Sequence, residues 1–117
     1  MTTRSSDNVD LFVYGTLRDK RLLQQLTGKP FRTSPACLKD FKKWTTPAGY
    51  PYILPNKGSK VAGLLISGID PESLRRLDRY EDEGQLYFRK KITVICGKRR
   101  VACQAYIGNS RLHRRGF

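Results

Sequence analysis

A glutamate on the apolar face of a predicted helix is the first residue of this sequence that could do chemistry. An Asp-Pro pair typical of helix starts opens the helix predicted over residues 70–83. Leu74, Leu77 and Glu81 follow at spacings of three and four residues, so they share one face. Burial and the negative end of the helix dipole both raise the pKa of such a carboxyl group, and a carboxyl with a pKa near neutrality suits proton transfer.

The same position also fits a purely structural glutamate. A buried carboxylate is stable when it is paired. Arg89 and the hydroxyl of Tyr87 are the candidate partners, because they follow the helix closely in the chain. Glu81 would then hold the strands after the helix against it. On the residue pattern alone, this structural role is the commoner one.

The corner at which the first predicted strand ends is a second candidate site. Residues 10–15 are mostly apolar and stop at Gly15, which is followed by Thr16. Consecutive backbone N–H groups at such a corner can bind an anion or a polarised carbonyl oxygen. Glycine more often marks an ordinary turn, so the corner by itself leaves both uses open.

The metal-binding and nucleophilic residue types are scarce. Cys37, Cys96 and Cys103 form no CxxC pair, and His113, the one histidine, lies in a basic C-terminal segment. These residues are too few for a structural zinc site, and His113 would have to be the base of any Ser-His or Cys-His arrangement. We therefore expect chemistry without a metal or cofactor.

The charge of the chain is strongly positive. Its 23 Lys and Arg residues against 10 Asp and Glu residues give a net charge of +13. Residues 89–117 contain nine of the basic residues and no acidic one. Such a segment attracts polyanions, so nucleic-acid binding is an alternative function, although no RNP, KH, zinc-finger or helix-turn-helix motif accompanies the charge. The N-terminal segment has no apolar core of a signal peptide and no run approaches the ~20 apolar residues of a membrane span, so we expect a cytoplasmic protein.

The helices and strands expected from the sequence, which must position these residues, indicate an α+β fold. At 117 residues the chain fits a single domain, and we expect flexible tails at 1–9 and 109–117. Many short strands around a small core favour a small mixed β-barrel with flanking short helices. The expected elements are strands at 10–15, 35–44, 61–67, 86–96 and 99–107, helices at 18–27 and 70–83, and a loop at 45–60 that folds back onto the body.

Three stretches together resemble a known family. LFVYGTLR near the N-terminus, GYPYILPNKGSKVAGLLI in the middle and LDRYEDEGQLYFRKKITV after the helix resemble the γ-glutamylcyclotransferase-like family, which includes γ-glutamylamine cyclotransferases and plant avirulence-induced proteins. The resemblance covers about residues 10–107. It implies a small-molecule substrate and an enzyme that releases 5-oxoproline and a free amine from a γ-glutamyl amine or peptide. The competing possibility is a catalytically silent binding module.

The resemblance also implies roles for individual residues. The family's catalytic glutamate stands in a D-x-[FY]-E element, which corresponds to Glu81. The backbone of the corner is expected to hold the γ-glutamyl group, and an aromatic-proline segment is expected to wall the pocket. The corner residues are Tyr14, Gly15, Thr16 and Leu17, and the wall residues are Tyr50, Pro51 and Tyr52.

Two further residues belong to the expected site. Arg89 either binds the substrate carboxylate or neutralises Glu81, and the structural pairing is favoured because arginine pairs readily with carboxylates. Tyr106, in the last strand, either lines the pocket or packs in the core. The family glycine after the glutamate is replaced by Asp82, and a glycine comes only at Gly84, so we expect a different turn there.

Overall fold

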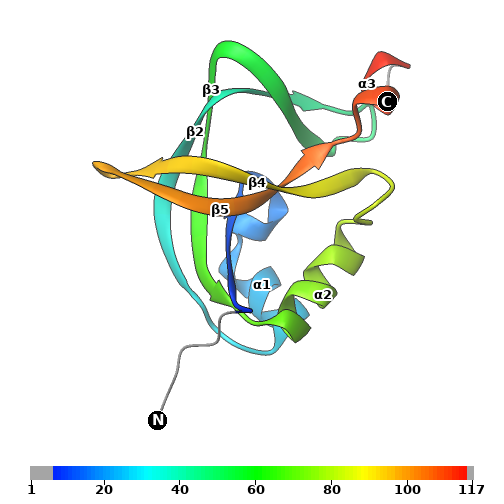
Figure 1. Cartoon of the computed structure of the whole chain (residues 1–117). Coiled ribbons are helices and arrows are strands. Elements are labelled where there is room, and N and C mark those ends of the chain that lie inside the picture. The colour runs from blue at the N-terminus through cyan, green and yellow to red at the C-terminus, as the bar shows by residue number, and fades with distance from the viewer. Residues whose placement is uncertain (1–6, 116–117) are drawn as a thin grey trace.

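The computed structural model describes residues 7–115, and within this range five strands combine with three α-helices and one 3-10 helix (Figure 1). This confirms the predicted α+β class. None of the helices in this range is long and apolar enough to cross a membrane. The strands are β1 (Val9–Val13), β2 (Arg32–Thr45), β3 (Pro51–Ile69), β4 (Tyr87–Cys96) and β5 (Arg99–Gly108).

The strands form one mixed sheet that closes on itself. Its order is β1-β3-β2-β4-β5, with β5 returning to β1. β1 runs parallel to β5, and the other pairs are antiparallel. β2 meets β4 at the pair Cys37–Ile95. The predicted small barrel thus corresponds to a five-stranded sheet whose two long hairpins, β2–β3 and β4–β5, meet at this contact.

The loop predicted over residues 45–60 is wrong, because β3 begins at Pro51 and continues without interruption to Ile69. Only residues 46–50 form the turn between β2 and β3. A bulge at Asp40 (φ 64°) bends the hairpin, and the Asp40 carboxylate accepts a hydrogen bond from the N–H of Gly58 (2.9 Å). The outer part of β3 pairs with β2 alone, and an edge position of this kind tolerates Pro55. The turn-forming residues therefore lie within a strand.

Four helical segments accompany the sheet: η1 (Thr16–Arg18), α1 (Lys20–Thr27), α2 (Pro71–Tyr80) and α3 (Ser110–Arg114). The single helix predicted at 18–27 is divided at Asp19, whose carboxylate caps α1 by accepting from the N–H of Arg21 (2.9 Å). The predicted helix 70–83 starts where expected, with Asp70 as its N-cap, but ends at Tyr80.

The expected C-terminal tail contains a helix in its described part. In α3, His113 packs edge-on against Trp44, and its Nδ1 lies 2.6 Å from the hydroxyl of Tyr52. These contacts attach α3 to the far end of the β2–β3 hairpin. Of the expected N-terminal tail, residues 1–6 lie outside the described range and Val9 already begins β1; residues 116–117 also lie outside it.

The core fills the inside of the closed sheet. Phe12, Val94 and Ala105 come from three different strands, point to this inner side and are completely buried. Leu11 and Ile66, which are paired with each other, are completely buried on the other face of the sheet. Burial of each large apolar side chain stabilises the fold by about 1.5–3 kcal/mol. Leu77 of α2 is also completely buried, so α2 is packed against the body of the protein. The C-terminal end of α2 lies beside the corner after β1, where the hydroxyls of Tyr80 and Thr16 are in contact.

Candidate functional site

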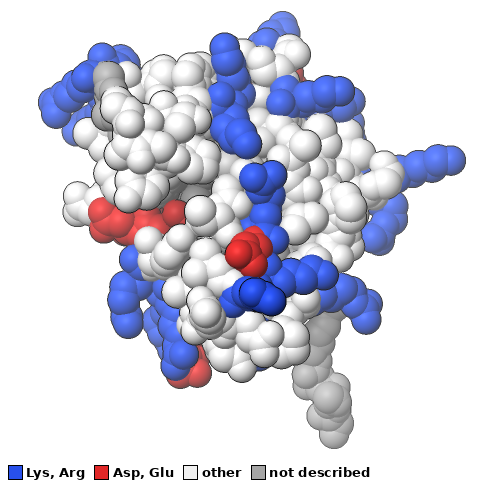
Figure 2. Space-filling model, turned by 180° about the vertical axis from the view of Figure 1, so that it is seen from behind, with Lys and Arg blue, Asp and Glu red and all other residues white. Residues whose placement is uncertain are grey.

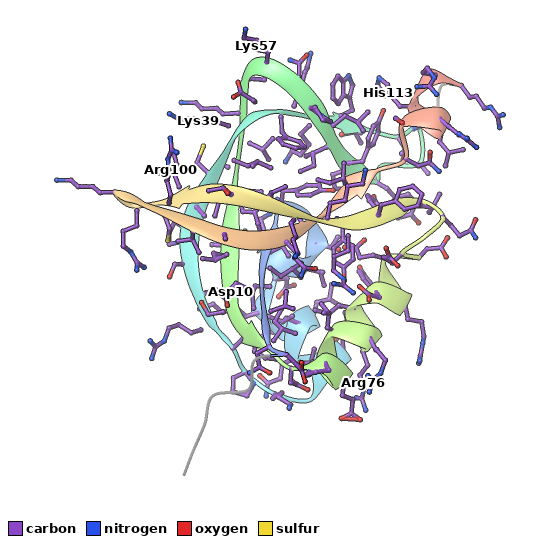
Figure 3. All side chains as sticks on the ribbon, in the orientation of Figure 1. Asp10, Lys39, Lys57, Arg76, Arg100 and His113 are labelled. Carbon is purple, nitrogen blue, oxygen red and sulfur yellow. The ribbon has the colours of Figure 1, made fainter. Side chains whose placement is uncertain are left out.

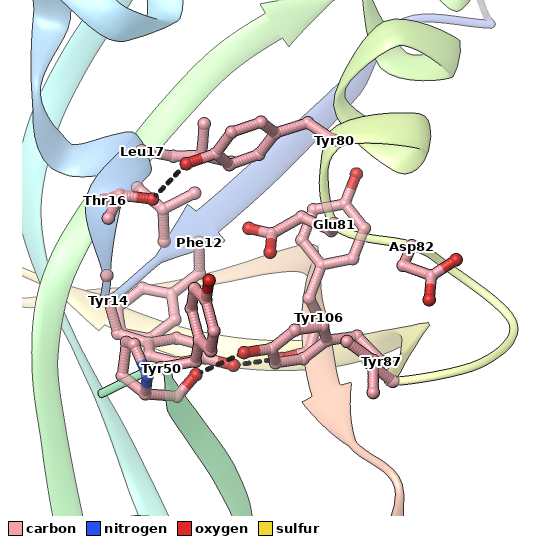
Figure 4. Close-up of a pocket in the computed structure, with 14 residues that line it drawn as sticks. Phe12, Tyr14, Thr16, Leu17, Tyr50, Tyr80, Glu81, Asp82, Tyr87 and Tyr106 are labelled. Carbon is pink, nitrogen blue, oxygen red and sulfur yellow. Dashed lines mark hydrogen bonds between the residues drawn. The ribbon is translucent and has the colours of Figure 1, made fainter. Parts of the chain in front are cut away.

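A cavity of about 420 Å³ opens where β1, β5 and the end of α2 meet (Figure 4). Its lining comes from four segments that are distant in the chain: β1 with the corner after it, the turn before β3, the end of α2 with the segment after it, and β5. The lining residues are Phe12, Val13, Tyr14, Gly15, Thr16, Leu17, Tyr50, Pro51, Tyr80, Glu81, Asp82, Leu86, Tyr87 and Tyr106.

Glu81 is the C-cap residue of α2, and its carboxylate points into the cavity (Figure 4). The helix ends here in a Schellman-type turn. The N–H of Glu81 donates to the carbonyl of Leu77 (2.9 Å), and the N–H of Glu83 donates to the carbonyl of Asp78 (2.9 Å). Asp82 between them adopts a left-handed φ of 54°. The family glycine position is thus occupied by an aspartate in a conformation that glycine favours.

The environment of Glu81 raises its proton affinity. The side chain is half-buried, and burial raises the pKa of Glu81 from 4.5 to about 7. Among the described residues, the cavity lining includes no Lys, Arg or His that could oppose this rise. Both protonation states of Glu81 are therefore accessible near neutral pH, as a group that first takes and then returns a proton requires.

Arg89 does not neutralise Glu81, and this part of the sequence prediction is wrong. Its guanidinium pairs with both carboxylate oxygens of Asp78, at 2.8 and 2.9 Å, and also donates to Gln104. The Asp78 carboxylate correspondingly raises the pKa of Arg89. Arg89 is absent from the cavity lining. Because the arginine is held by Asp78, the carboxylate of Glu81 keeps its raised pKa.

Three buried tyrosines form the floor of the cavity. The hydroxyl of Tyr14 donates to the carbonyl of Tyr106 (2.6 Å), and that of Tyr87 donates to the carbonyl of Pro51 (2.6 Å). The hydroxyl of Tyr106 donates to Asp78 (2.7 Å). Burial raises the pKa of Tyr87 to about 12 and also raises those of Tyr14 and Tyr106. The three phenols therefore remain neutral at physiological pH, with their rings held in place by these bonds.

The corner after β1 forms the opposite side of the cavity. Gly15 is the N-cap of η1, and a Cβ atom at this position would lie 2.9 Å from Cγ of Pro51. The glycine therefore permits the close approach of two pocket segments. The hydroxyls of Thr16 and Tyr80 lie 2.9 Å apart, which connects the corner to the end of α2 across the cavity (Figure 4).

The structure brings most of the predicted site residues together. Tyr52 is an exception: it is buried, stacks on Trp44 and lies against His113, so it does not wall the cavity. Tyr50 stands at the mouth with 62% of its surface exposed. The predicted residues that line the cavity are Tyr14, Gly15, Thr16, Leu17, Tyr50, Pro51, Glu81 and Tyr106.

The sequence prediction missed Asp78 and Tyr80 as parts of the site. Both stand in the D-x-Y-E element, which was the signal available for them. Asp78 does not line the cavity itself. Its carboxylate accepts a hydrogen bond from the hydroxyl of Tyr106, and it thereby fixes a ring that does line the cavity. That contact joins residues 28 positions apart and depends on how α2 lies on β5. Within residues 7–115, no group of three or more His, Cys, Asp or Glu side chains is arranged to hold a metal ion.

Comparison with known proteins decides the family. The family model "Gamma-glutamyl cyclotransferase, AIG2-like" matches residues 11–116. The chain belongs to this family. AIG2-like protein D of Arabidopsis thaliana is 34% identical over 86 residues, which are 73% of this chain and 55% of that protein. The chain thus spans about half the length of the curated relatives it matches.

Solved structures of other proteins share the fold. A solution structure of an Arabidopsis thaliana protein matches with a TM-score of 0.80 at 21% identity, covering 97% of this chain and 89% of that one. A structure described as a gamma-glutamyl cyclotransferase matches with a TM-score of 0.74 at 19% identity, covering 87% of this chain and 67% of that one. At these identities the match is one of architecture.

Proposed function

We propose that this protein is a cyclotransferase that converts a γ-glutamyl amine or γ-glutamyl peptide into 5-oxoproline and a free amine. The observation that carries the proposal is the carboxylate of Glu81, half-buried in a cavity of about 420 Å³ that the corner after β1 also lines. A cavity of this size suits a small molecule. Family membership supports the same class of reaction.

The reaction needs one group that both accepts and donates a proton. The α-amine of the γ-glutamyl group attacks its own γ-carbonyl carbon and closes a five-membered ring. Glu81 takes a proton from the ammonium group, which then attacks as a free amine, and the protonated carboxyl gives this proton to the departing nitrogen as the carbon–nitrogen bond breaks. The ring nitrogen loses its second proton through the same carboxylate to the departing amine, which leaves as an ammonium ion. Atoms balance without water, since the products are 5-oxoproline and the amine. A pKa near 7 suits Glu81 to both steps.

The remaining lining residues would bind and fold the substrate. In this proposal, backbone N–H groups of Gly15, Thr16 and Leu17 hold the γ-glutamyl group, and the rings of Tyr14 and Tyr106 confine it. Holding the α-amine close to the γ-carbonyl removes several kcal/mol from the barrier, because the reacting groups no longer have to find each other. An amide directed at the developing oxyanion contributes about 2.7–4 kcal/mol.

The test is release of 5-oxoproline from a panel of γ-glutamyl compounds that differ in the leaving amine: a peptide, ε-(γ-glutamyl)lysine and a small alkylamine. We expect turnover of at least one. The matching N-acetyl-γ-glutamyl amide should be inert, because its blocked nitrogen cannot attack. Release of amine from the acetylated compound would indicate hydrolysis and would contradict the cyclisation.

The residue test compares two charge-neutralising variants. Glu81→Gln should lower kcat/KM by about 10²- to 10⁴-fold, the usual contribution of a general acid and base. Glu83→Gln is the matched control, because Glu83 lies two residues away, accepts from the N–H of Arg89 and does not line the cavity. Equal loss in both variants would remove Glu81 from the mechanism. A protein inactive on the whole panel would instead favour a binding module.

A further inference from the structure

The register of the strands places a row of side chains on the outer face of the sheet. Arg100 is paired with Ile95, Ile95 with Cys37, and Cys37 with Ala62. Directly paired residues point to the same side of a sheet. The row therefore crosses β5, β4, β2 and β3 in one direction, and its members share the face opposite to the core.

Three more cations occupy positions on the same face. Lys39 and Lys60 lie two residues beyond the row on β2 and β3, and Lys91 lies four residues beyond it on β4. Lys39, Lys60 and Lys91 are exposed, whereas Leu38 and Val61, which lie between the outward positions, are buried. We name this set, Lys39, Lys60, Lys91 and Arg100, the basic sheet face.

The basic sheet face holds like charges together. Lys39 and Lys60 are directly opposite each other across β2 and β3, an arrangement that repels. The nearby acid, Asp40, uses its carboxylate on the N–H of Gly58. Lys39 and Arg100 project from the same side of the sheet, whereas Arg76 of α2 lies at the other end of the molecule (Figure 3). Lys and Arg side chains are scattered over the face shown in Figure 2, between larger uncharged areas, and acidic side chains form only small groups there.

Most side chains between these cations are short. Cys37, Ala62, Thr93 and Ala102 occupy outward positions among them, the larger Ile95 is half-buried, and none of the five is aromatic. The large exposed apolar side chains of the described residues, Tyr50, Tyr80 and Leu86, line the cavity instead. The basic sheet face therefore presents positive charge without aromatic rings for stacking on single-stranded bases and without large exposed apolar side chains for insertion into a membrane.

We propose that the basic sheet face binds the phosphate backbone of double-stranded nucleic acid. Cations contacting phosphates displace condensed counterions, which provides affinity independent of base sequence. This surface combines Lys39 and Lys60 from the first half of the chain with Lys91 and Arg100 from the second. It is separate from the cavity, so the inference is independent of the proposed reaction.

The experiment measures binding of a fluorescent 20-base-pair DNA duplex to the full chain at 50–200 mM salt. One variant replaces Lys39, Lys60, Lys91 and Arg100 with glutamine. The control variant replaces Lys20, Arg21, Arg75 and Arg79, which are exposed on α1 and α2, with glutamine. Both variants lose four positive charges, so they differ only in where the charge is lost. Thermal unfolding verifies that both are folded.

We expect the first variant to lose about 10³-fold in affinity at 150 mM salt, with a salt dependence shallower by about 3.6 in the log–log slope, if all four cations contact phosphates. The control should change far less. Equal losses in the two variants would overturn the proposal, because net charge alone would explain them. Tighter binding to a single strand of the same length, or to phosphatidylserine vesicles, would also overturn it.

Discussion

Replacing Glu81 by glutamine should stabilise the protein at alkaline pH and leave its stability unchanged at acid pH. Folding raises the pKa of Glu81 from 4.5 to about 7 because the pocket removes water from the carboxylate. Each tenfold change in proton affinity is worth about 1.4 kcal/mol. The ionised form is therefore disfavoured in the folded protein by about 2–3 kcal/mol, where the lower value allows for the exposed part of this half-buried side chain.

The direction follows from the raised pKa. Below pH 4.5 the carboxyl is protonated in both the folded and the unfolded chain, and Glu81 then resembles glutamine. As the pH rises from about 4.5 to 7, the unfolded chain has lost this proton while the folded protein still holds it, so the wild-type protein loses stability relative to the Glu81→Gln variant; the loss is complete above about pH 8. For a domain of this size, about 4 °C in Tm accompanies each kcal/mol, so the variant should melt on the order of 10 °C higher at pH 8.5.

The assay is thermal unfolding of both proteins at intervals from pH 4 to pH 8.5, with chemical denaturation at the two extremes. Glu83→Gln is again the control, and its difference from wild type should not grow across pH 7. A Glu81→Gln difference that is constant from pH 5 to pH 8.5 would refute the reasoning, because the pKa of Glu81 would then be the same in the folded and unfolded chains. If the proposed reaction is correct, kcat/KM of the variant should be lower than that of the wild-type protein at every pH at which the wild-type protein is active.

Three further changes test other parts of the structure. Gly63→Ala should destabilise the protein by at least ~2 kcal/mol in urea denaturation, because the added Cβ would lie 2.2 Å from the carbonyl oxygen of Val13; an unchanged midpoint would contradict this packing. Asp82→Gly should raise the free energy of unfolding by about 1 kcal/mol, since glycine adopts the left-handed φ of 54° without steric cost, and a lower Tm would argue against a Schellman turn. Lys60→Glu should stabilise by ~0.2–1 kcal/mol at low salt, because it turns the repulsive pair with Lys39 into an attractive one; calorimetry at 20 and 500 mM salt should show the gain only at the lower salt.

Much of the fold could be predicted because its signals are local. The start of α2 follows from the cap at Asp70, and the β4–β5 hairpin follows from two apolar runs around Gly97. The end of α2 was placed too late. The charged residues after Tyr80 allow a helix, but Asp82 turns the backbone into the left-handed region. Side-chain identity alone does not decide between these conformations.

Features that depend on pairing between distant segments could not be predicted in the same way. The segment 51–60 is rich in turn-forming residues, yet β2 pairs with residues 51–55 and with Lys60, and this pairing makes the segment part of a strand. Two acidic residues of the D-x-Y-E element, Asp78 and Glu81, are possible ion-pair partners of Arg89. Arg89 pairs with Asp78, and this pairing depends on how α2 lies across β4. Tyr52 is turned away from the cavity because it packs on Trp44 and His113.

The sequence by itself determined which residues could carry the chemistry: a glutamate in register with buried leucines, and a strand that stops at a Gly-Thr corner. Helical periodicity and capping act over a few residues, so they can be read along the chain. Only the tertiary structure decided that Glu81 and the corner line one cavity and that Arg89 is held by another carboxylate. The raised pKa of Glu81 comes from the same source, because desolvation is produced by segments that only folding brings together.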